Sequence, residues 1–299
     1  MDAPSRMING TRFDLSKLRS LSRFLSPGER SPAPAATSAR VVCVASGKGG
    51  VGKSVLATNL AVARASQGER VLLLDFDAGL ANLHLLLGLA PEHDLGHVLD
   101  GKVQARQAVV PGPGGVHLLS GGVGRHTLAS PTRRELDRLF QALRPLEDDY
   151  DLVIVDHGAG MAYSTVAHLA ATSTLLLVTS HEVTALSDAY ALYKRARLVN
   201  EHLRVGLVLN RIPGESAEAA AWERFKSVSL KFLGDCPEYV GSVPQDDAVL
   251  RSVQARTPVT LAEPSSRASQ AFARIAAWPP IDHARTPTAF YDRARRALA

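Results

Sequence analysis

Cysteines, long apolar runs and net charge in the centre of the chain are scarce in this sequence, and each shortage excludes a class of protein. The 299 residues contain two cysteines, Cys43 and Cys236, and neither belongs to a C-x-x-C pair, which argues against a disulfide framework and a cysteine metal site. No run approaches the roughly 18 apolar residues of a membrane span, and the N-terminus lacks a signal-peptide hydrophobic region, so we expect a cytoplasmic protein. The composition, 45% hydrophobic and 21% charged, is typical of a globular chain with a large core.

Net positive charge is confined to the two ends. Residues 1–39 have six basic and three acidic side chains, and residues 282–299 have four and two, so residues 40–281 are neutral within the total of +5. We expect weak contact with an anionic surface to be made by these basic termini. A membrane and nucleoid DNA both fit this charge, and neither end is rich enough to choose between them.

The N-terminal segment 1–39 has the pattern of an extension. Apolar residues recur at helical spacing among basic ones between 12 and 25, which predicts a short basic amphipathic helix. Residues 31–38, rich in Pro, Ala and Ser, are typical of a linker. Two interpretations stand: a partly disordered tail with incidental leucines, or a docking helix on a linker.

Strand and helix patterns alternate from residue 40 onward. Apolar runs predict strands at 41–45, 70–75, 116–119, 151–156, 174–179, 204–209 and 239–242, and helical spacing predicts helices at 54–66, 132–145, 162–171, 185–199, 217–232 and 266–277. This order predicts one doubly wound α/β domain, 40–278, whose mostly parallel sheet is covered by helices on both faces and binds its ligand at the carboxyl ends of the strands. A basic tail, 279–299, would follow it with a second short amphipathic helix at 289–298.

The stretch from Ser46 to Ser54, S-G-K-G-G-V-G-K-S, fits the phosphate-binding pattern G-x-x-x-x-G-K-[ST]. Chance would produce such a match in only ~1% of chains of this length, and here it lies between a predicted strand and a predicted helix. Backbone N–H groups of such a loop cradle phosphates, while Lys53 reaches the terminal phosphates and the Ser54 hydroxyl binds Mg²⁺. The residues expected to bind ATP here are Gly47, Lys48, Gly49, Gly50, Val51, Gly52, Lys53, Ser54 and Val55.

Lys48 is not needed to cradle phosphate within one subunit, so it either reaches the nucleotide of a second subunit or is a solvated lysine. The run K-G-G-V-G-K-S, together with D-F-D-A-G-L-A-N from Asp75 to Asn82, resembles the MinD/ParA family of deviant-Walker P-loop ATPases. The resemblance implies an ATP-bound homodimer in which Lys48 completes the partner's site. It also implies that Asp77 orients or activates the attacking water and that Asp75 lies near the metal. Lys48, Lys53 and Asp77 are therefore the expected catalytic residues.

The apolar strand that ends at Asp156 has the Walker-B pattern, in which the aspartate holds Mg²⁺ through water. Ser54, Asp75 and Asp156 together form the expected metal site. The resemblance extends over about 40–277 and places Asn210, Arg211 and Pro244 at the adenine, where an amide offers both a donor and an acceptor.

Two further stretches, H-G-A-G after Asp156 and T-S-H-E-V-T-A-L-S-D-A-Y-A-L-Y-K from Thr179 to Lys194, resemble the flagellar-number-regulator branch of this family (FlhG/FleN type). This branch implies a slow, partner-stimulated ATP hydrolase, a dimerising switch that regulates the number or placement of flagella. Its protein partners would be an SRP-type GTPase, a transcription regulator or a positioning scaffold, at the inner membrane, the cell pole or the nucleoid. The alternative is a positioning ATPase of the same family for cell division, chromosomes or another cargo. A metabolic or metal-carrier P-loop enzyme is disfavoured by Lys48 and the D-x-D motif.

Three histidines depart from the family pattern: His84, His157 and His181 stand where relatives have an acid, Thr or Ser, and Pro. Two interpretations stand for them. They either tune turnover or make it pH-sensitive, because histidine titrates near physiological pH, or they are tolerated variants on a partner-facing surface. At the N-terminus, D-L-S-K-L-R is only a shortened form of the motif with which flagellar relatives stimulate an SRP-type GTPase, so that partner stays open.

Overall fold

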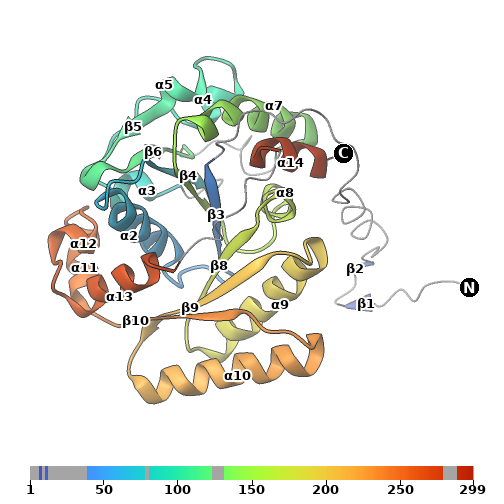
Figure 1. Cartoon of the computed structure of the whole chain (residues 1–299), viewed down its shortest axis with the longest axis vertical. Helices are drawn as coiled ribbons and strands as arrows, with labels where there is room; N and C mark the ends of the chain where they lie inside the picture. Colours follow the sequence, from blue (N-terminus) through green and yellow to red (C-terminus); the bar gives the residue numbers. More distant parts are fainter. Residues whose placement is uncertain are drawn as a thin grey trace, which may run out of the picture.

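The computed structural model describes residues 39–77, 81–122, 131–278 and 288–298, together with the backbone of residues 7–8 and 11–12. An eight-stranded sheet in the order β10-β9-β8-β3-β7-β4-β6-β5 forms its centre (Figure 1). The strands are β3 (Arg40–Ala45), β4 (Val71–Phe76), β5 (Val109–Pro111), β6 (His117–Leu119), β7 (Leu152–His157), β8 (Thr174–Thr179), β9 (Arg204–Ile212) and β10 (Glu238–Pro244). Neighbouring strands are parallel except at the edge, where β5 pairs antiparallel with β6.

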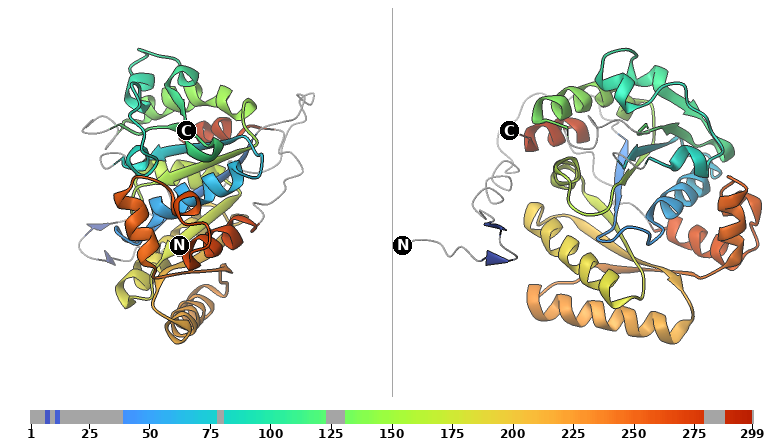
Figure 2. Two further views of the ribbon diagram at one scale, coloured as in Figure 1. Left: turned by 90° about the vertical axis from the view of Figure 1, so that its left-hand side faces the viewer. Right: turned by 180° about the vertical axis from the view of Figure 1, so that it is seen from behind.

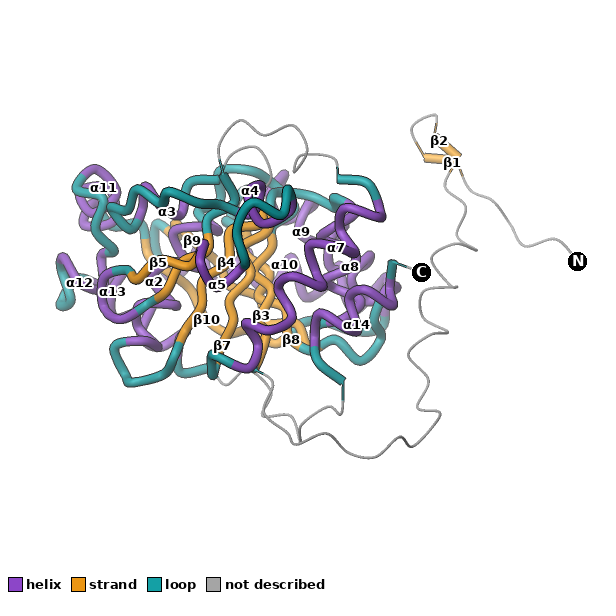
Figure 3. Tube along the Cα trace, turned by 90° about the horizontal axis from the view of Figure 1, so that it is seen from above, coloured by secondary structure: helices purple, strands orange, loops and turns teal. Residues whose placement is uncertain are grey.

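Helices cover both faces of the sheet, as Figure 3 shows from above. One layer contains α2 (Lys53–Ala65), α3 (Leu83–Leu86), α11 (Asp247–Gln254), α12 (Val259–Ala262) and α13 (Arg267–Ala276). The other contains α4 (Leu95–Leu99), α5 (Ala105–Ala108), α7 (Arg133–Leu143), α8 (Tyr163–Ala171), α9 (Val183–Val199), α10 (Glu215–Leu233) and α14 (Phe290–Ala297). The 3₁₀ turns η2 (Pro113–Gly115) and η3 (Arg144–Asp148) lie between elements, and a separate antiparallel pair joins β1 (Met7–Ile8) to β2 (Thr11–Arg12).

Alternation within the strands explains the two layers. In β3, Val41 and Cys43 face one hydrophobic cluster, whereas Val42 and Val44 face the other. Successive side chains of a strand point to opposite faces, so a strand covered on both sides must be apolar at nearly every position. This is why the sheet strands read as continuous apolar runs in the sequence.

The predicted doubly wound sheet is confirmed, with the bounds of its strands and helices displaced by a few residues. The sequence did not reveal β5, whose three residues end in Pro111, nor the short helices α3, α4, α5, α11 and α12. A three-residue edge strand with a proline leaves too little periodicity to identify. The helix predicted at 12–25 lies outside the described residues, apart from the backbone of Arg12 in β2.

The helix predicted at 289–298 is present as α14, but the structure corrects its interpretation as part of a tail. Phe290, Tyr291, Ala294 and Leu298 are buried, and α14 packs against α7 and α8 (Figure 2, dark red beside green). The buried carboxylate of Glu147 accepts hydrogen bonds of 2.8 Å from the backbone N–H groups of Phe290 and Tyr291. The apolar stripe that would contact a membrane is therefore covered by the domain itself.

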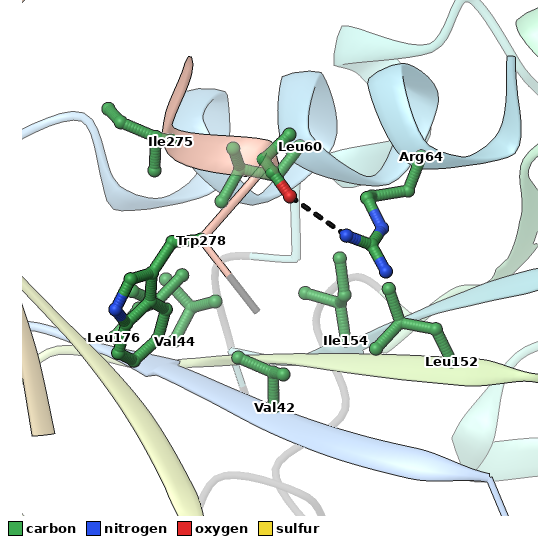
Figure 4. Close-up of a pocket in the computed structure, with 10 residues that line it drawn as sticks. Val42, Val44, Leu60, Arg64, Leu152, Ile154, Leu176, Ile275 and Trp278 are labelled. Carbon is green, nitrogen blue, oxygen red and sulfur yellow. Dashed lines mark hydrogen bonds between the residues drawn. The ribbon is translucent and has the colours of Figure 1, made fainter. Parts of the chain in front are cut away.

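A pocket with an empty volume of about 360 Å³ lies between the sheet, α2 and α13, away from the phosphate-binding loop (Figure 4). Its walls are apolar except for Arg64. The Arg64 guanidinium donates from Nη1 to the carbonyl of Ala276 at 3.0 Å and from Nε to Glu69 Oε2 at 2.7 Å. Because these partners hold the charge of Arg64, we interpret the pocket as a packing void. Among the described helices, none combines the length and the hydropathy needed to cross a bilayer.

Candidate nucleotide site

The loop between β3 and α2 is held in a tight conformation that requires glycine at three positions. A Cβ atom on Gly47 would lie 2.2 Å from the carbonyl carbon and oxygen of Asp188 in α9. Gly50 and Gly52 have φ angles of 76° and 86°, in the left-handed region that side chains disfavour. The N-cap residue of α2 is Gly52, which has no side chain to accept from the first backbone N–H groups of the helix, so these groups are available to phosphate oxygens.

Several of the predicted site residues lie around the side chain of Lys53. Its ammonium group is buried and donates to Asp156 Oδ1 at 2.6 Å and to Ser54 Oγ at 3.2 Å. It also lies 3.9 Å from Asp77 Oδ2. The ends of β4 and β7 and the start of α2 thus converge on one lysine, and Val55 follows in the first turn of α2.

Asp156 offers a carboxylate oxygen of the kind that binds magnesium. It is fully buried, and Oδ2 has no hydrogen-bond partner among the residues that the structure describes. Burial raises the pKa of Asp156, and the charge of Lys53 acts against this rise. In the described ranges no group of three or more His, Cys, Asp or Glu side chains is placed to hold a metal. The unpaired Oδ2 of Asp156 fits Mg²⁺, which is usually bound by one or two protein oxygens together with phosphates and waters.

Asp75 lies opposite Asp156 in the β4–β7 register but has different partners. Its Oδ1 accepts from the backbone N–H of Asp77 at 3.1 Å, and its Oδ2 accepts from that of Leu83 at 3.2 Å. Burial and the nearby Asp156 raise the pKa of Asp75 to about 7. Both oxygens therefore accept backbone hydrogen bonds, one from Asp77 and one from Leu83 at the start of α3, which favours a structural role for Asp75 over direct metal binding.

Lys48 has partners within its own subunit. Its Nζ donates to Glu182 Oε2 at 2.9 Å and to Thr184 Oγ1 at 3.0 Å, and its side chain is 39% exposed. The Lys48 hydrogen bond and charge lower the pKa of Glu182. The sequence marked Glu182 and Thr184 only as part of the branch-specific stretch, and their role as partners of Lys48 was missed.

The end of β9 contacts the loop with two side chains. Asn210 Nδ2 donates to the carbonyl of Val51 at 2.7 Å, and Arg211 Nη1 donates to that of Gly50 at 3.3 Å. Arg211 has a φ of 59°, unusual for a residue other than glycine. Asn210 and Arg211 therefore support the loop directly, in addition to the expected contact with adenine.

A polar pocket with an empty volume of about 570 Å³ opens beside this contact. It is lined by Lys48, Gly49, Gly50, Val51, Ser180, His181, Glu182, Arg211 and Gln245. Its size and polar lining suit the base and ribose of a nucleotide. Pro244 ends β10 opposite Ile212, one residue before the lining. Gln245 lines the pocket in its place, and Ser180, His181, Glu182 and Gln245 are the lining residues that the sequence did not predict for the site.

The three unusual histidines occupy different environments. His181 lines the polar pocket and is exposed, whereas His84 is partly buried, and burial and the charge of Arg256 lower its pKa. His157 is completely buried, and burial lowers its pKa to about 3. The interpretation of a surface variant is therefore wrong for His157, which follows the predicted strand 151–156 and is the last residue of β7.

Comparisons with known proteins identify the family of this chain. Residues 42–259 match the family model described as the CobQ/CobB/MinD/ParA nucleotide binding domain. The chain is 36% identical over 244 residues to the antiactivator FleN of Pseudomonas aeruginosa, covering 80% of this chain and 87% of that protein. It is 28% identical over 238 residues to the flagellum site-determining protein YlxH of Helicobacter pylori, covering 79% and 80%.

Among solved structures, the septum site-determining protein MinD of Pyrococcus horikoshii, complexed with Mg-ADP, matches with a TM-score of 0.65 and 26% identity. This match covers 80% of this chain and 94% of the other. The range that the family model matches, 42–259, includes the loop, Lys53, Asp77, Asp156 and Asn210. The fold brings these residues to one edge of the sheet. The chain belongs to the CobQ/CobB/MinD/ParA family of nucleotide-binding domains.

Proposed function

We propose that this protein is an ATP-dependent, dimerising switch that regulates the number or placement of flagella. The observation that carries the proposal is the convergence of Lys53, Asp77 and Asp156 beside a lysine, Lys48, that the loop itself does not need. Similarity to an antiactivator and to a flagellum site-determining protein supports the flagellar branch. The Mg-ADP complex of the similar MinD supports ATP and Mg²⁺ as the ligands.

Different residues of the site have different roles in ATP hydrolysis. Loop N–H groups and Lys53 bind the phosphates, so Lys53 exchanges its contact with Asp156 for a phosphate oxygen. Ser54 and Asp156 would hold Mg²⁺, which neutralises charge on the phosphates. Asp77, close to Lys53, orients the attacking water. Because little else assists the water, hydrolysis by the protein alone is slow and a partner stimulates it.

Lys48 couples the binding of ATP to the formation of the homodimer. In the subunit described here it is bound to Glu182 and Thr184, and in the ATP-bound homodimer it leaves them for the phosphates of the partner's nucleotide. The dimer then binds protein partners, such as an SRP-type GTPase, a transcription regulator or a positioning scaffold. Since α14 is covered by the domain, contact with the inner membrane, cell pole or nucleoid would be made by the basic residues 1–39.

The mass of the protein in solution tests the switch. With ATP, the Asp77→Ala variant should accumulate as a dimer, because nucleotide binds and is not hydrolysed. Lys48→Ala added to Asp77→Ala should bind ATP and stay monomeric. A monomer in both cases would reject the dimer model.

Counts of flagella in a deletion strain test the biology. A changed number or position of flagella supports the proposal. The second candidate, a positioning ATPase for cell division, chromosomes or another cargo, is favoured by the similarity to the septum site-determining MinD. Unchanged flagella with displaced division sites would select it.

A further inference from the structure

A buried group of rings connects the C-terminal helix to the strands that carry the catalytic acids. His168 of α8 is at its centre, with ring centroids 4.6 Å from Phe76, 4.9 Å from His157 and 5.4 Å from Phe290. Phe140 of α7 and Tyr291 complete the group at 4.8 Å and 5.9 Å from His168. These residues come from β4, β7, α7, α8 and α14, which are far apart in the sequence and adjacent in the fold (Figure 1).

The two ends of this group of rings adjoin different parts of the molecule. Phe76 precedes Asp77, and His157 follows Asp156, so one end adjoins both acids of the nucleotide site. The β4–β7 register places Phe76 opposite His157, which keeps both rings on one level of the sheet. At the other end, Phe290 and Tyr291 are the first two residues of α14, and Glu147 fixes both through their backbone N–H groups.

The imidazoles have no hydrogen bonds that would fix them independently. All four ring nitrogens of His157 and His168 are buried without a hydrogen-bond partner among the described residues, as is the hydroxyl of Tyr291. Buried polar groups are nearly always paired, so this arrangement is unusual. Only packing against neighbouring rings sets the orientation of His157 and His168, and Phe290 and Tyr291 provide part of that packing.

We propose that α14 is a positioning element for ATP hydrolysis: Phe290 fixes the His168 ring, His168 fixes His157 and Phe76, and these residues fix Asp156 and Asp77. A displacement of α14 therefore moves the acids relative to Lys53 without altering the loop that binds the phosphates. Gly158 adds to the coupling, because a Cβ atom there would lie 3.1 Å from Asp77 Oδ1, so the backbone after His157 lies close to the catalytic acid. The inference rests on the proposed ATPase function.

The test compares two phenylalanines of equal burial. Phe290 is 1% exposed, and the control, Phe225 of α10, is 2% exposed and packs against Tyr193, between α9 and α10. Phe290→Leu and Phe225→Leu remove the same atoms, and Leu keeps enough volume for the domain to fold. Thermal unfolding followed by circular dichroism should show similar losses of stability.

Single-turnover hydrolysis and the Kd for ADP separate positioning from stability. Phe290→Leu should lower the hydrolysis rate about tenfold, because displacements of a fraction of an ångström slow positioned reactions, and should leave the ADP Kd within about twofold. Phe225→Leu should leave both unchanged. His168→Ala should behave as Phe290→Leu does, and His168→Phe, which keeps the ring, should restore the rate. Equal rates in Phe290→Leu and Phe225→Leu would overturn the inference.

A spectroscopic measurement remains decisive if the wild-type protein does not hydrolyse ATP. Nitrogen-15 spectra of the imidazole side chains report the environment of His157 and His168 with no turnover. Adding ADP should shift both resonances in the wild type, and Phe290→Leu should shift both without ADP, whereas Phe225→Leu should not. Absent hydrolysis with these shifts would reject the proposed function alone, and unmoved resonances would reject the coupling.

Discussion

Replacing Lys53 with methionine should destabilise the protein most at neutral pH and less in acid. Lys53 supplies the charge that compensates the carboxylate of Asp156, which is 0% exposed, at a distance of 2.6 Å. Removing one member of a buried ion pair typically destabilises a protein by about 3–5 kcal/mol, because the remaining charge is uncompensated. The side chain of methionine fills much of the same volume, so the change isolates the charge.

The pH dependence of this loss follows from linkage. Burial already raises the pKa of Asp156, and without Lys53 the pKa rises further. A carboxyl group whose pKa is higher in the folded state favours folding at low pH, and this contribution is lost as the pH rises through the folded-state pKa. The difference between variant and wild type should therefore shrink by at most about 1.4 kcal/mol per pH unit as the pH falls.

Urea unfolding at pH 7.5, 6.5 and 5.5, without nucleotide, measures this difference. The matched control is Lys53→Met combined with Asp156→Asn, which removes both charges of the ion pair and should recover most of the stability at pH 7.5. An undiminished stability of Lys53→Met at pH 7.5, or a loss of the same size at every pH, would refute the reasoning.

Three further predictions concern other contacts. Glu182→Gln together with Thr184→Ala releases Lys48 from its own subunit and should lower the ATP concentration needed for dimerisation about two- to fivefold, as expected for a partly exposed ion pair. Sedimentation across a series of ATP concentrations measures the midpoint of dimerisation, and an unchanged midpoint would contradict this prediction. Asp75, with a pKa of about 7 in the fold, favours the folded state below its unfolded pKa, and this contribution is lost as the pH rises through 7. Asp75→Asn should therefore flatten the fall in unfolding free energy between pH 5 and 8, and an unchanged slope would argue against a buried acid. Val42→Ile should fill part of the pocket between the sheet, α2 and α13 and raise the free energy of unfolding by about 0.5–1 kcal/mol. Calorimetry measures this change, and a lower Tm would mean that the pocket cannot take a methyl group.

The sequence predicted the sheet and the phosphate-binding residues because both depend on local patterns. Continuous apolar runs mark strands covered on both faces, and the loop motif fixes the positions of Gly47, Lys53 and Ser54 within nine residues. Asp77 was implied by the resemblance of the D-x-D motif to the MinD/ParA family, and Asp156 followed from the Walker-B pattern at the end of an apolar strand. These inferences need no knowledge of packing between distant elements.

The remaining features depend on which surfaces meet. The stripe of α14 looks the same in sequence whether it faces a membrane or a groove between α7 and α8, and only the fold shows that Glu147 caps it. Likewise, nothing local to His157 indicates that His168, eleven residues later, would lie against it. The partners of Lys48 are more than 130 residues away, so their contact could not be read from spacing.

Gly47 has a consequence for how the protein can diversify. The loop touches α9 through the main chain of Asp188 and Ala189, and the side chain of Asp188 points to solvent. A contact between two backbones is indifferent to which side chains the helix presents on its outer surface. Apart from Thr184, which binds Lys48, the outward residues of α9 can therefore be exchanged for contact with a new partner while the nucleotide loop keeps its shape. This separates the choice of partner from the timing of the switch.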